Sequence, residues 1–224
     1  MNWLSRGLAS SIGRKFVMGL TGLLLIGFVF THLGGNLLMY AGVGTYNGYA
    51  HTLHSYPNFI IAAETGLLLL FLAHILIAIN ITRENRAARQ QGYALKRSKQ
   101  GRSSATPSAL MFISGALVLG FILLHLSEFR FEIRHPGPEG EEPFTKALRL
   151  LQDPVTASVY FVGSLFLGWH LVHGFQSAFQ TFGWNHPKYT PLIKKLSVLI
   201  AVVVGLGFAS FPVWAFLKKY GVLP

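Results

Sequence analysis

Long apolar segments alternate with shorter polar ones along nearly the whole chain. A helix that crosses a bilayer needs about 20 mostly apolar residues, and five segments reach this length. They are residues 16–41, 57–82, 107–129, 154–182 and 192–217. The pattern therefore predicts an all-α protein, an integral membrane bundle of five transmembrane helices, in which residues 1–224 form a single domain.

The composition agrees with this membrane class. The 224 residues are 51% hydrophobic and only 12% charged, and the mean hydropathy is +0.45. Five spans leave little length for a separate soluble domain. The chain has no cysteine, which excludes disulfides, thiolate metal sites, iron–sulfur ligation and cysteine-linked haem from this chain.

The formal net charge of +11 is unevenly distributed. Thirteen of the 19 Lys and Arg lie before the first span, in the second loop or in the fourth loop, which share one side of the bilayer. The third loop and the C-terminal tail, on the other side, carry six cations, and this loop holds six of the 8 acids. The positive-inside rule thus predicts a cytoplasmic N-terminus and an outside C-terminus. Because the cations flank spans and are not interleaved with base-stacking aromatics, no nucleic acid is expected as a partner.

The polar connections differ in character. Residues 40–57 are uncharged and rich in Gly and Tyr, and we expect them to form a loop. Residues 128–154 are numerous enough for a short interfacial helix near residues 144–151. The chain shows no tandem repeat. Any similarity between one span and another therefore lies in individual residues.

Four histidines occupy matching positions in four consecutive spans: His32, His74, His125 and His173. Each lies in the last third of its span. Consecutive helices run in opposite directions, so His32 and His125 fall at one depth and His74 and His173 at the other, at a rise of about 1.5 Å per residue. An ionisable side chain inside a span is costly and marks a functional site. Two pairs of imidazoles at two depths indicate two stacked haems, each with two axial histidines.

Other roles for these histidines are also considered. A histidine in a span can form a simple hydrogen bond between helices, and zinc would require ligands that converge on one point. In the fourth span, His170 and His173 are three residues apart and share a face. His173 is preferred as the axial ligand, because Gly174 gives clearance beside it and its depth matches that of His74. The exchange of the two is the alternative, with His170 otherwise bonded to a propionate or lining a quinone or proton path.

Glu64 and Arg130 are candidates for chemistry near the expected outer side. Glu64 is the one acid in the interior of a span, about two turns from its expected outer end. It is either a neutral, hydrogen-bonded acid between helices or a group that exchanges protons with a quinone. Arg130, about one turn beyond His125, suits the propionates of the outer haem.

Four further histidines lie in connections, where a solvated side chain is the ordinary state. For His135 and His186 that state is expected. His51 and His54 differ, because their uncharged, Tyr-rich segment lies near the outer haem and could cover a quinone pocket. We therefore group His51 and His54 with Glu64 as candidates for quinone and proton chemistry.

Several short motifs resemble those of a known family when they are taken together. They are Ser11-Ile12-Gly13-Arg14-Lys15, Thr31-His32-Leu33-Gly34-Gly35-Asn36, Ala73-His74-Ile75, Leu124-His125-Leu126 and the run from Trp169 to Gln180. Their order, spacing and topology resemble the cytochrome b membrane anchor of succinate dehydrogenase and quinol:fumarate reductase, in its single-subunit, five-helix, di-haem class. The resemblance covers essentially the whole chain.

This resemblance implies two haem b cofactors, a proximal one bound by His74 and His173 and a distal one bound by His32 and His125. It implies a membrane quinone, typically menaquinone, as the substrate near the distal haem. It also implies two partner subunits: a flavoprotein with FAD, where succinate and fumarate interconvert, and an iron–sulfur protein with Fe–S clusters. The expected setting is multi-pass in the lipid of a bacterial cytoplasmic membrane, where the complex can form a higher oligomer.

The expected activity is that of one subunit of a succinate:quinone oxidoreductase. The chain would transfer electrons between the iron–sulfur subunit and quinone, without dicarboxylate chemistry of its own. The first alternative is a di-haem anchor of another respiratory enzyme, such as a hydrogenase or formate dehydrogenase, whose helix count and motifs fit less well. The second is a haem-free, proton-coupled permease, although no pair of interrupted half-helices occurs in corresponding positions.

Overall fold

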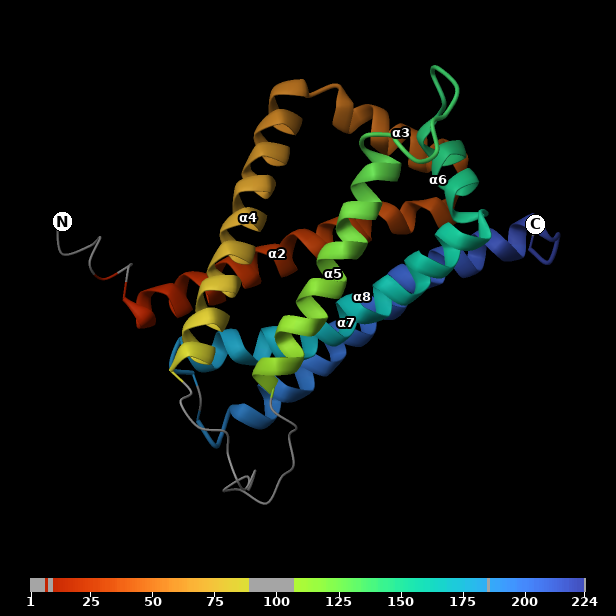
Figure 1. Ribbon diagram of the computed structural model, residues 1–224. Coiled ribbons are helices and arrows are strands. Elements are labelled where there is room, and N and C mark those ends of the chain that lie inside the picture. The colour runs from red at the N-terminus through yellow and green to blue at the C-terminus, as the bar shows by residue number, and fades with distance from the viewer. Residues whose placement is uncertain (1–6, 8–9, 89–106, 185, 224) are drawn as a thin grey trace.

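Five long helices dominate the computed structural model, which describes residues 7, 10–88, 107–184 and 186–223 (Figure 1). They are α2 (Ser11–Leu37), α4 (Pro57–Ala87), α5 (Pro107–Phe129), α7 (Pro154–Thr181) and α8 (Thr190–Lys219). All five are long and apolar enough to cross a membrane. The expectation of an all-helical chain with five such segments is therefore confirmed for the described residues, which form no strand.

Three shorter helical elements lie in the connections: η1 (Leu38–Ala41), α3 (Val43–His54) and α6 (Pro143–Leu151). The short helix expected near residues 144–151 is confirmed as α6. The expectation of a loop over residues 40–57 is wrong, because most of this segment is helical. Gly42, at a φ of +99°, redirects the chain between η1 and α3, in a conformation that is cheap only for glycine.

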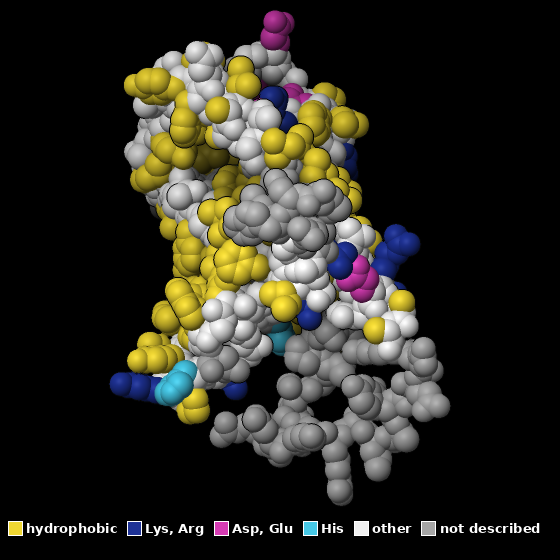
Figure 2. Space-filling model, turned by 90° about the vertical axis from the view of Figure 1, so that its left-hand side faces the viewer, with side chains coloured by type: hydrophobic (Ala, Val, Ile, Leu, Met, Phe, Trp, Pro, Cys, Tyr) yellow, Lys and Arg dark blue, Asp and Glu magenta, His cyan; other side chains and the backbone are white. Residues whose placement is uncertain are grey.

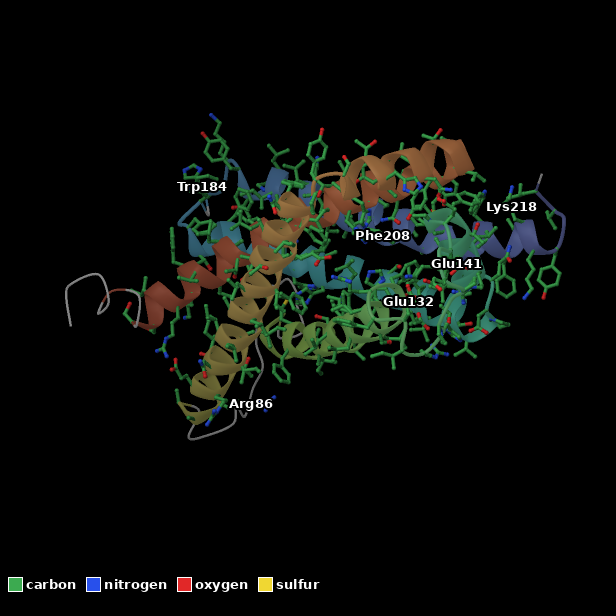
Figure 3. All side chains as sticks on the ribbon, turned by 90° about the horizontal axis from the view of Figure 1, so that it is seen from above. Arg86, Glu132, Glu141, Trp184, Phe208 and Lys218 are labelled. Atoms are coloured by element: carbon green, nitrogen blue, oxygen red, sulfur yellow. The ribbon has the colours of Figure 1, made fainter. Side chains whose placement is uncertain are left out.

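The bundle has two ends, which we name the α6 end and the Trp184 end. α2, α5 and α8 run from the Trp184 end to the α6 end, and α4 and α7 run back (Figure 1). Figure 3 shows Glu132 and Glu141 at the α6 end, and Arg86 and Trp184 at the opposite end. Residues 89–106, which carry five of the cations expected in the second loop, lie outside the described part of the chain.

The closest helix pair is α7 and α8, and small residues make the approach possible. A Cβ atom on Gly168 would lie 2.8 Å from the carbonyl oxygen of Ala201 and 3.2 Å from the Cα of Gly205. Close backbone approach at glycine is a common way for membrane helices to associate, because lipid gives them no hydrophobic reason to do so. α7 and α8 are therefore a tightly packed pair, and α2 and α5 pack against it.

α6 closes its end of the bundle as an amphipathic helix. Its buried residues are Phe144, Ala147, Leu150 and Leu151, at the spacing of a single helical face. Phe144, Ala147 and Leu151 share one apolar cluster with residues of α2, η1, α7 and α8. On the polar face, the Lys146 ammonium donates to the carbonyl of Phe129 at 2.8 Å. A cation at this position stabilises the C-terminus of α5 through the helix dipole.

α4 is the least covered of the long helices. It packs against α2 and α3, yet none of its residues is buried. Its two ends are held by ion pairs, between Glu84 and Arg14 at 2.5 Å and between Glu64 and Arg130 at 3.1 Å. Hydrophobic side chains cover much of the face of the molecule in Figure 2. The apolar sides of α4 are thus free to contact lipid or a bound group.

Candidate functional site

His32 of α2 and His125 of α5 lie side by side towards the α6 end. The centres of their imidazole rings are 5.9 Å apart and the ring planes meet at 80°. Phe28 stacks on His32 at 5.4 Å and Phe129 stacks on His125 at 5.2 Å. These stacking contacts hold both rings in place, so the pair that was expected from depth alone is brought together by two different helices.

The His125 ring also has a polar partner on a third helix. Its Nδ1 atom lies 3.3 Å from the hydroxyl of Tyr160 on α7. The phenol packs against the imidazole with ring centres 5.8 Å apart. Because Nδ1 faces Tyr160, the remaining ring nitrogen, Nε2, is the one left to bind another group.

His74 of α4 is oriented by a hydroxyl group of α2. Its Nδ1 atom lies 3.1 Å from Thr21 Oγ1. The Thr21 hydroxyl has a single proton, and it donates to the backbone carbonyls of Val17 at 2.9 Å and Met18 at 3.1 Å. With that proton on one of these carbonyls, the hydroxyl oxygen is able to accept from Nδ1–H of His74. This contact fixes the tautomer and leaves the Nε2 lone pair of His74 available.

His170 of α7 is oriented in the same way by α5. Its Nδ1 atom lies 3.0 Å from Ser114 Oγ, and the Ser114 hydroxyl donates to the carbonyl of Met111 at 3.1 Å. With the Ser114 proton on that carbonyl, the hydroxyl oxygen is able to accept from Nδ1–H of His170, which leaves the Nε2 lone pair available. In both cases the hydroxyl residue is followed by glycine. A Cβ on Gly115 would lie 3.3 Å from Cε1 of His170.

The same arrangement lies on α2 and α5 in the same register. Thr21 precedes His32 by eleven residues, and Ser114 precedes His125 by eleven residues. Eleven residues make just over three turns, so each hydroxyl shares a face with its histidine at a separation of about 16 Å along the axis. Each helix therefore serves two levels: it orients a partner's histidine at one level and supplies its own at the other.

Sequence reasoning missed the two hydroxyl–glycine pairs, Thr21-Gly22 and Ser114-Gly115. A signal was nevertheless present, because both pairs stand eleven residues before a histidine of a span. Such a spacing is invisible to a search for tandem repeats, since the residues between the pairs and the histidines differ. The pairs are recognisable only when the two helices are compared with each other.

His173 has a different environment from His170. Its Nδ1 atom lies 3.5 Å from the carbonyl oxygen of Trp169 in its own helix, and no other helix supplies a partner among the described residues. His170 interacts electrostatically with both His74 and His173. The expected clearance beside His173 does exist, because a Cβ on Gly174 would meet only Met111 Cε, at 3.9 Å.

Glu64 and Arg130, which were expected to have separate roles, contact each other. Arg130 Nε lies 3.1 Å from Glu64 Oε1, and Arg130 Nη2 donates to Glu64 Oε2 at 3.1 Å. The two-pronged contact joins α4 to the end of α5. Both side chains are exposed on the protein surface, 49% for Glu64 and 60% for Arg130. Glu64 therefore has a cationic partner, which the two sequence interpretations of this residue did not include.

His51 and His54 lie on the exposed surface of α3. His51 Nε2 is 2.9 Å from Glu142 Oε2, next to α6. His54 Nδ1 lies 2.8 Å from the carbonyl oxygen of Ala50 within α3. A carbonyl oxygen can only accept, so Nδ1–H is the donor. No contact among the described residues joins either histidine to Glu64. The three quinone candidates therefore have separate partners in the described structure.

Glu128 is a buried acid that sequence reasoning treated as part of the acidic loop. Its side chain is 0% exposed. Its Oε1 atom accepts from Arg134 at 2.7 Å and from the Thr156 hydroxyl at 3.0 Å. His135 Nδ1 is 3.4 Å from the same oxygen, so His135 is not simply a solvated histidine. A buried carboxylate needs such partners, because burial without pairing is costly.

The acids at the α6 end are held in their charged form by neighbouring donors. The Lys146 ammonium beside Glu132 lowers the pKa of that carboxyl, and the Arg149 guanidinium lowers the pKa of Glu141 through hydrogen bonds of 2.7 and 2.9 Å. The backbone N–H of Thr156, at 2.8 Å, lowers the pKa of Asp153, which caps α7. These contacts fix the α5–α6–α7 connection next to the histidine pair.

No group of three His, Asp or Glu side chains in the described ranges could hold a metal ion. Comparison with protein-family models, with curated proteins and with solved structures finds no match for this chain.

Proposed function

We propose that this chain is a di-haem cytochrome b membrane anchor that transfers electrons between an iron–sulfur subunit and a membrane quinone, in a succinate dehydrogenase or fumarate reductase. One observation is the main support for the proposal. Histidines from four apolar helices lie at two levels, and three of them have Nδ1 bonded to a neighbouring hydroxyl. Nδ1 bonded and Nε2 free is the state in which an imidazole binds iron.

The His32–His125 pair has the right spacing for two axial ligands of one iron. An imidazole nitrogen binds a transition metal at about 2 Å, and the ring centre lies about 1 Å behind it. Two rings on opposite sides of one iron therefore have centres about 6 Å apart, and here the distance is 5.9 Å. The 80° angle between the planes is compatible, because each ring can rotate about its own bond to the metal.

For the second site we propose His74 with His170, and this revises the preference for His173. Thr21 orients His74 and Ser114 orients His170, in the same manner and at the same register. His173 bonds only within its own helix. In this assignment His173 lies one turn away on the same face of α7, where it is available to contact the edge of the cofactor or a proton path.

Each haem, when bound, supplies reversible one-electron exchange at its iron. The protein residues supply orientation, burial and separation. The two levels are about 16 Å apart along α2 and α5, so an electron that passes from one to the other moves across a large part of the bilayer. Phe28 and Phe129 cover the His32 and His125 rings and exclude water from them, which tunes the potential of a bound group.

Quinone binding is proposed for the α6 end, where the distal haem would lie. Glu64 remains the proton-exchanging candidate, and its ion pair with Arg130 would have to open before the carboxylate accepts a proton. Arg130 then becomes free for a haem propionate. His51 and His54 are retained as candidates for covering the site. A Glu64→Gln variant is expected to keep its haems and lose most of its quinone reduction.

The membrane setting follows from the same proposal. The five apolar helices are compatible with a multi-pass membrane protein, and the basic Trp184 end is proposed to face the bacterial cytoplasm. There it would dock the iron–sulfur subunit and, through it, the flavoprotein that carries FAD. The α6 end and the C-terminus would lie outside. Menaquinone is the proposed quinone.

The proposal is tested by a dithionite-reduced minus oxidised spectrum of the purified full chain, with the haem quantified as its pyridine haemochrome. Two b-type haems per chain are expected. His32→Ala and His74→Ala should each remove a different one. A folded chain with a single haem would mean that one histidine pair is structural. A folded chain without haem would overturn electron transfer and favour the proton-coupled permease.

A further inference from the structure

Two unexplained features lie next to each other at the start of α7. The Tyr160 hydroxyl contacts Nδ1 of His125 at 3.3 Å. One turn earlier on α7, the Thr156 hydroxyl donates to the carboxylate of Glu128, which stands three residues after His125 on α5. Of the two carboxylate oxygens, Oε1 has Arg134 and Thr156 as donors. The other oxygen, Oε2, is buried and has no hydrogen-bond partner among the described residues. The proposed electron transfer uses Tyr160 only as a contact of His125 and has so far given no role to Glu128.

The unpaired Oε2 atom of Glu128 bears on the direction of the hydrogen bonds around it. A buried carboxylate oxygen that lacks a donor costs free energy, and a hydroxyl next to it relieves that cost by donating. A charged carboxylate is also a stronger acceptor than a neutral imidazole nitrogen. In the inferred arrangement, the single proton of Tyr160 turns towards this unpaired oxygen of Glu128. The phenol oxygen then accepts from Nδ1–H of His125, as the hydroxyl oxygens of Thr21 and Ser114 accept from their histidines.

We infer that Tyr160 and Glu128 are positioning residues for His125, which keep its proton on Nδ1 and raise the electron density at Nε2. This inference rests on the proposed function, because its consequence is a property of the haem that His125 would bind. An imidazole whose N–H donates towards an anion is a more basic ligand, and a more basic ligand stabilises ferric over ferrous iron. The His32–His125 site should therefore have a lower potential than the same site without Tyr160 or Glu128.

The arrangement is specific to one histidine of the pair. Tyr160 precedes His170 on α7 by ten residues, and Glu64 precedes His74 on α4 by ten residues. Glu64 thus occupies on α4 the register that Tyr160 occupies on α7. Glu64, however, pairs with Arg130, and no hydrogen bond to a ring nitrogen of His32 is found within the described ranges. The electronic effect therefore enters the distal site through His125 alone.

The test is a redox titration of the full chain with both haems bound, for wild type, Tyr160→Phe and Glu128→Gln. The component that His125→Ala removes is assigned to this site. We expect the midpoint potential of that component to rise in both variants. A tenfold change in the ferric-to-ferrous ratio corresponds to about 59 mV for a one-electron couple, and a change of this order is expected for Tyr160→Phe. The other component should not move.

Matched controls separate this effect from a general loss of packing or charge. Tyr40→Phe removes a phenol hydroxyl that bonds Ser210 at 2.6 Å at the same end of the bundle. Glu141→Gln removes a carboxylate that bonds Arg149. Neither control should shift either potential. Electron paramagnetic resonance of the oxidised protein should change at the distal site in Tyr160→Phe and in neither control.

Several outcomes would overturn the inference while the proposed function stands. Wild-type potentials in both Tyr160→Phe and Glu128→Gln would do so, as would equal shifts in the controls. If Tyr160→Phe loses its distal haem, an unshifted Glu128→Gln decides against the inference. Nitrogen-15 shifts of the histidine rings in the haem-free chain give an independent readout: the His125 signal should report protonated Nδ1 in wild type and a different tautomer in Tyr160→Phe. Absence of haem from the folded wild type would instead contradict the proposed function.

Discussion

The imidazole rings of His32 and His125 lie 5.9 Å apart, centre to centre, at the meeting of two helices that are far apart in the chain. Each ring is stacked on a phenylalanine of its own helix, one turn away. Two ionisable rings are brought together in an apolar layer, where neither gains from the other's charge. The haem proposed to lie between them would account for this arrangement, and the proposal leads to predictions that can be measured.

The choice between His170 and His173 is open to a direct test. His170→Ala is expected to remove one of the two haems and thus halve the haem content, because the partner that Ser114 orients is lost. His173→Ala is expected to keep both haems, since Trp169 in its own helix is the one hydrogen-bond partner of that ring among the described residues. Pyridine haemochrome quantitation of the two purified variants distinguishes the assignments. The reverse result would restore His173 as the axial ligand.

The hydroxyl groups that orient the histidines should matter for haem retention. Thr21→Val and Ser114→Ala each remove the acceptor of an Nδ1–H bond, and loss of such a partner typically weakens metal binding about 10- to 100-fold. Haem loss to excess apomyoglobin measures the effect. Thr31→Val is the matched control, because the Thr31 hydroxyl bonds only the Phe28 carbonyl. Equal haem loss from the control and the Thr21 variant would contradict the role of the hydroxyls.

Gly168 should tolerate no side chain. In Gly168→Ala the new methyl group would meet the Ala201 carbonyl at 2.8 Å and the Gly205 Cα at 3.2 Å, and backbone atoms cannot rotate away. We expect a loss of about 1–3 kcal/mol in the free energy of unfolding, as is usual for overpacking. Thermal unfolding in detergent measures it. Gly120→Ala, with no atom within 4 Å of its Cβ, should be neutral or stabilising.

Asp153 gives a prediction for the dependence of stability on pH. Its carboxylate caps α7, and Asp153→Ala should cost about 1 kcal/mol at neutral pH. The pKa of Asp153 lies below its ordinary value of 3.8, because the Thr156 N–H donates to the carboxylate. Its stabilisation is therefore complete above pH 3.8 and is lost as the pH falls through the folded-state pKa.

The matching measurement is the difference in unfolding temperature between wild type and Asp153→Ala at several pH values. That difference should shrink in the acid range. Asp153→Asn keeps a good capping side chain and removes the titration, so its stability should follow wild type near neutral pH. A difference that is constant with pH would show that the carboxylate contributes only by packing.

The apolar helices could be predicted from the sequence because hydrophobic runs of this length have few alternative structures. α6 was also accessible, since its buried positions follow a helical period. α3 was not, because Gly44, Gly48 and several tyrosines are typical of a loop. This helix buries none of its residues, so it leaves no periodic apolar pattern. It is held by individual contacts, such as Asn47 with the Phe144 N–H at 2.9 Å.

The sequence was enough to predict the depth of the histidines in the bundle. It was not enough to predict which side chains of other helices they contact. Depth follows from counting residues along a helix, which gave His32 opposite His125. Rotation about the helix axis is not fixed by counting, and it decides which of His170 and His173 meets Ser114. The pairing of Glu64 with Arg130 and the burial of Glu128 depend on side chains from different helices. Such contacts leave no mark on the local pattern of either segment.

The absence of buried residues from α4 has a consequence for how the protein is made. No residue of α4 belongs to a packed core, and ion pairs hold its two ends. The proposed cofactors would therefore have a route of entry from the lipid side, past α4, that leaves the contact between α7 and α8 intact. An immature chain in which α4 is not yet packed against α2 would expose His74 and a long apolar helix face to the quality-control proteases of the membrane.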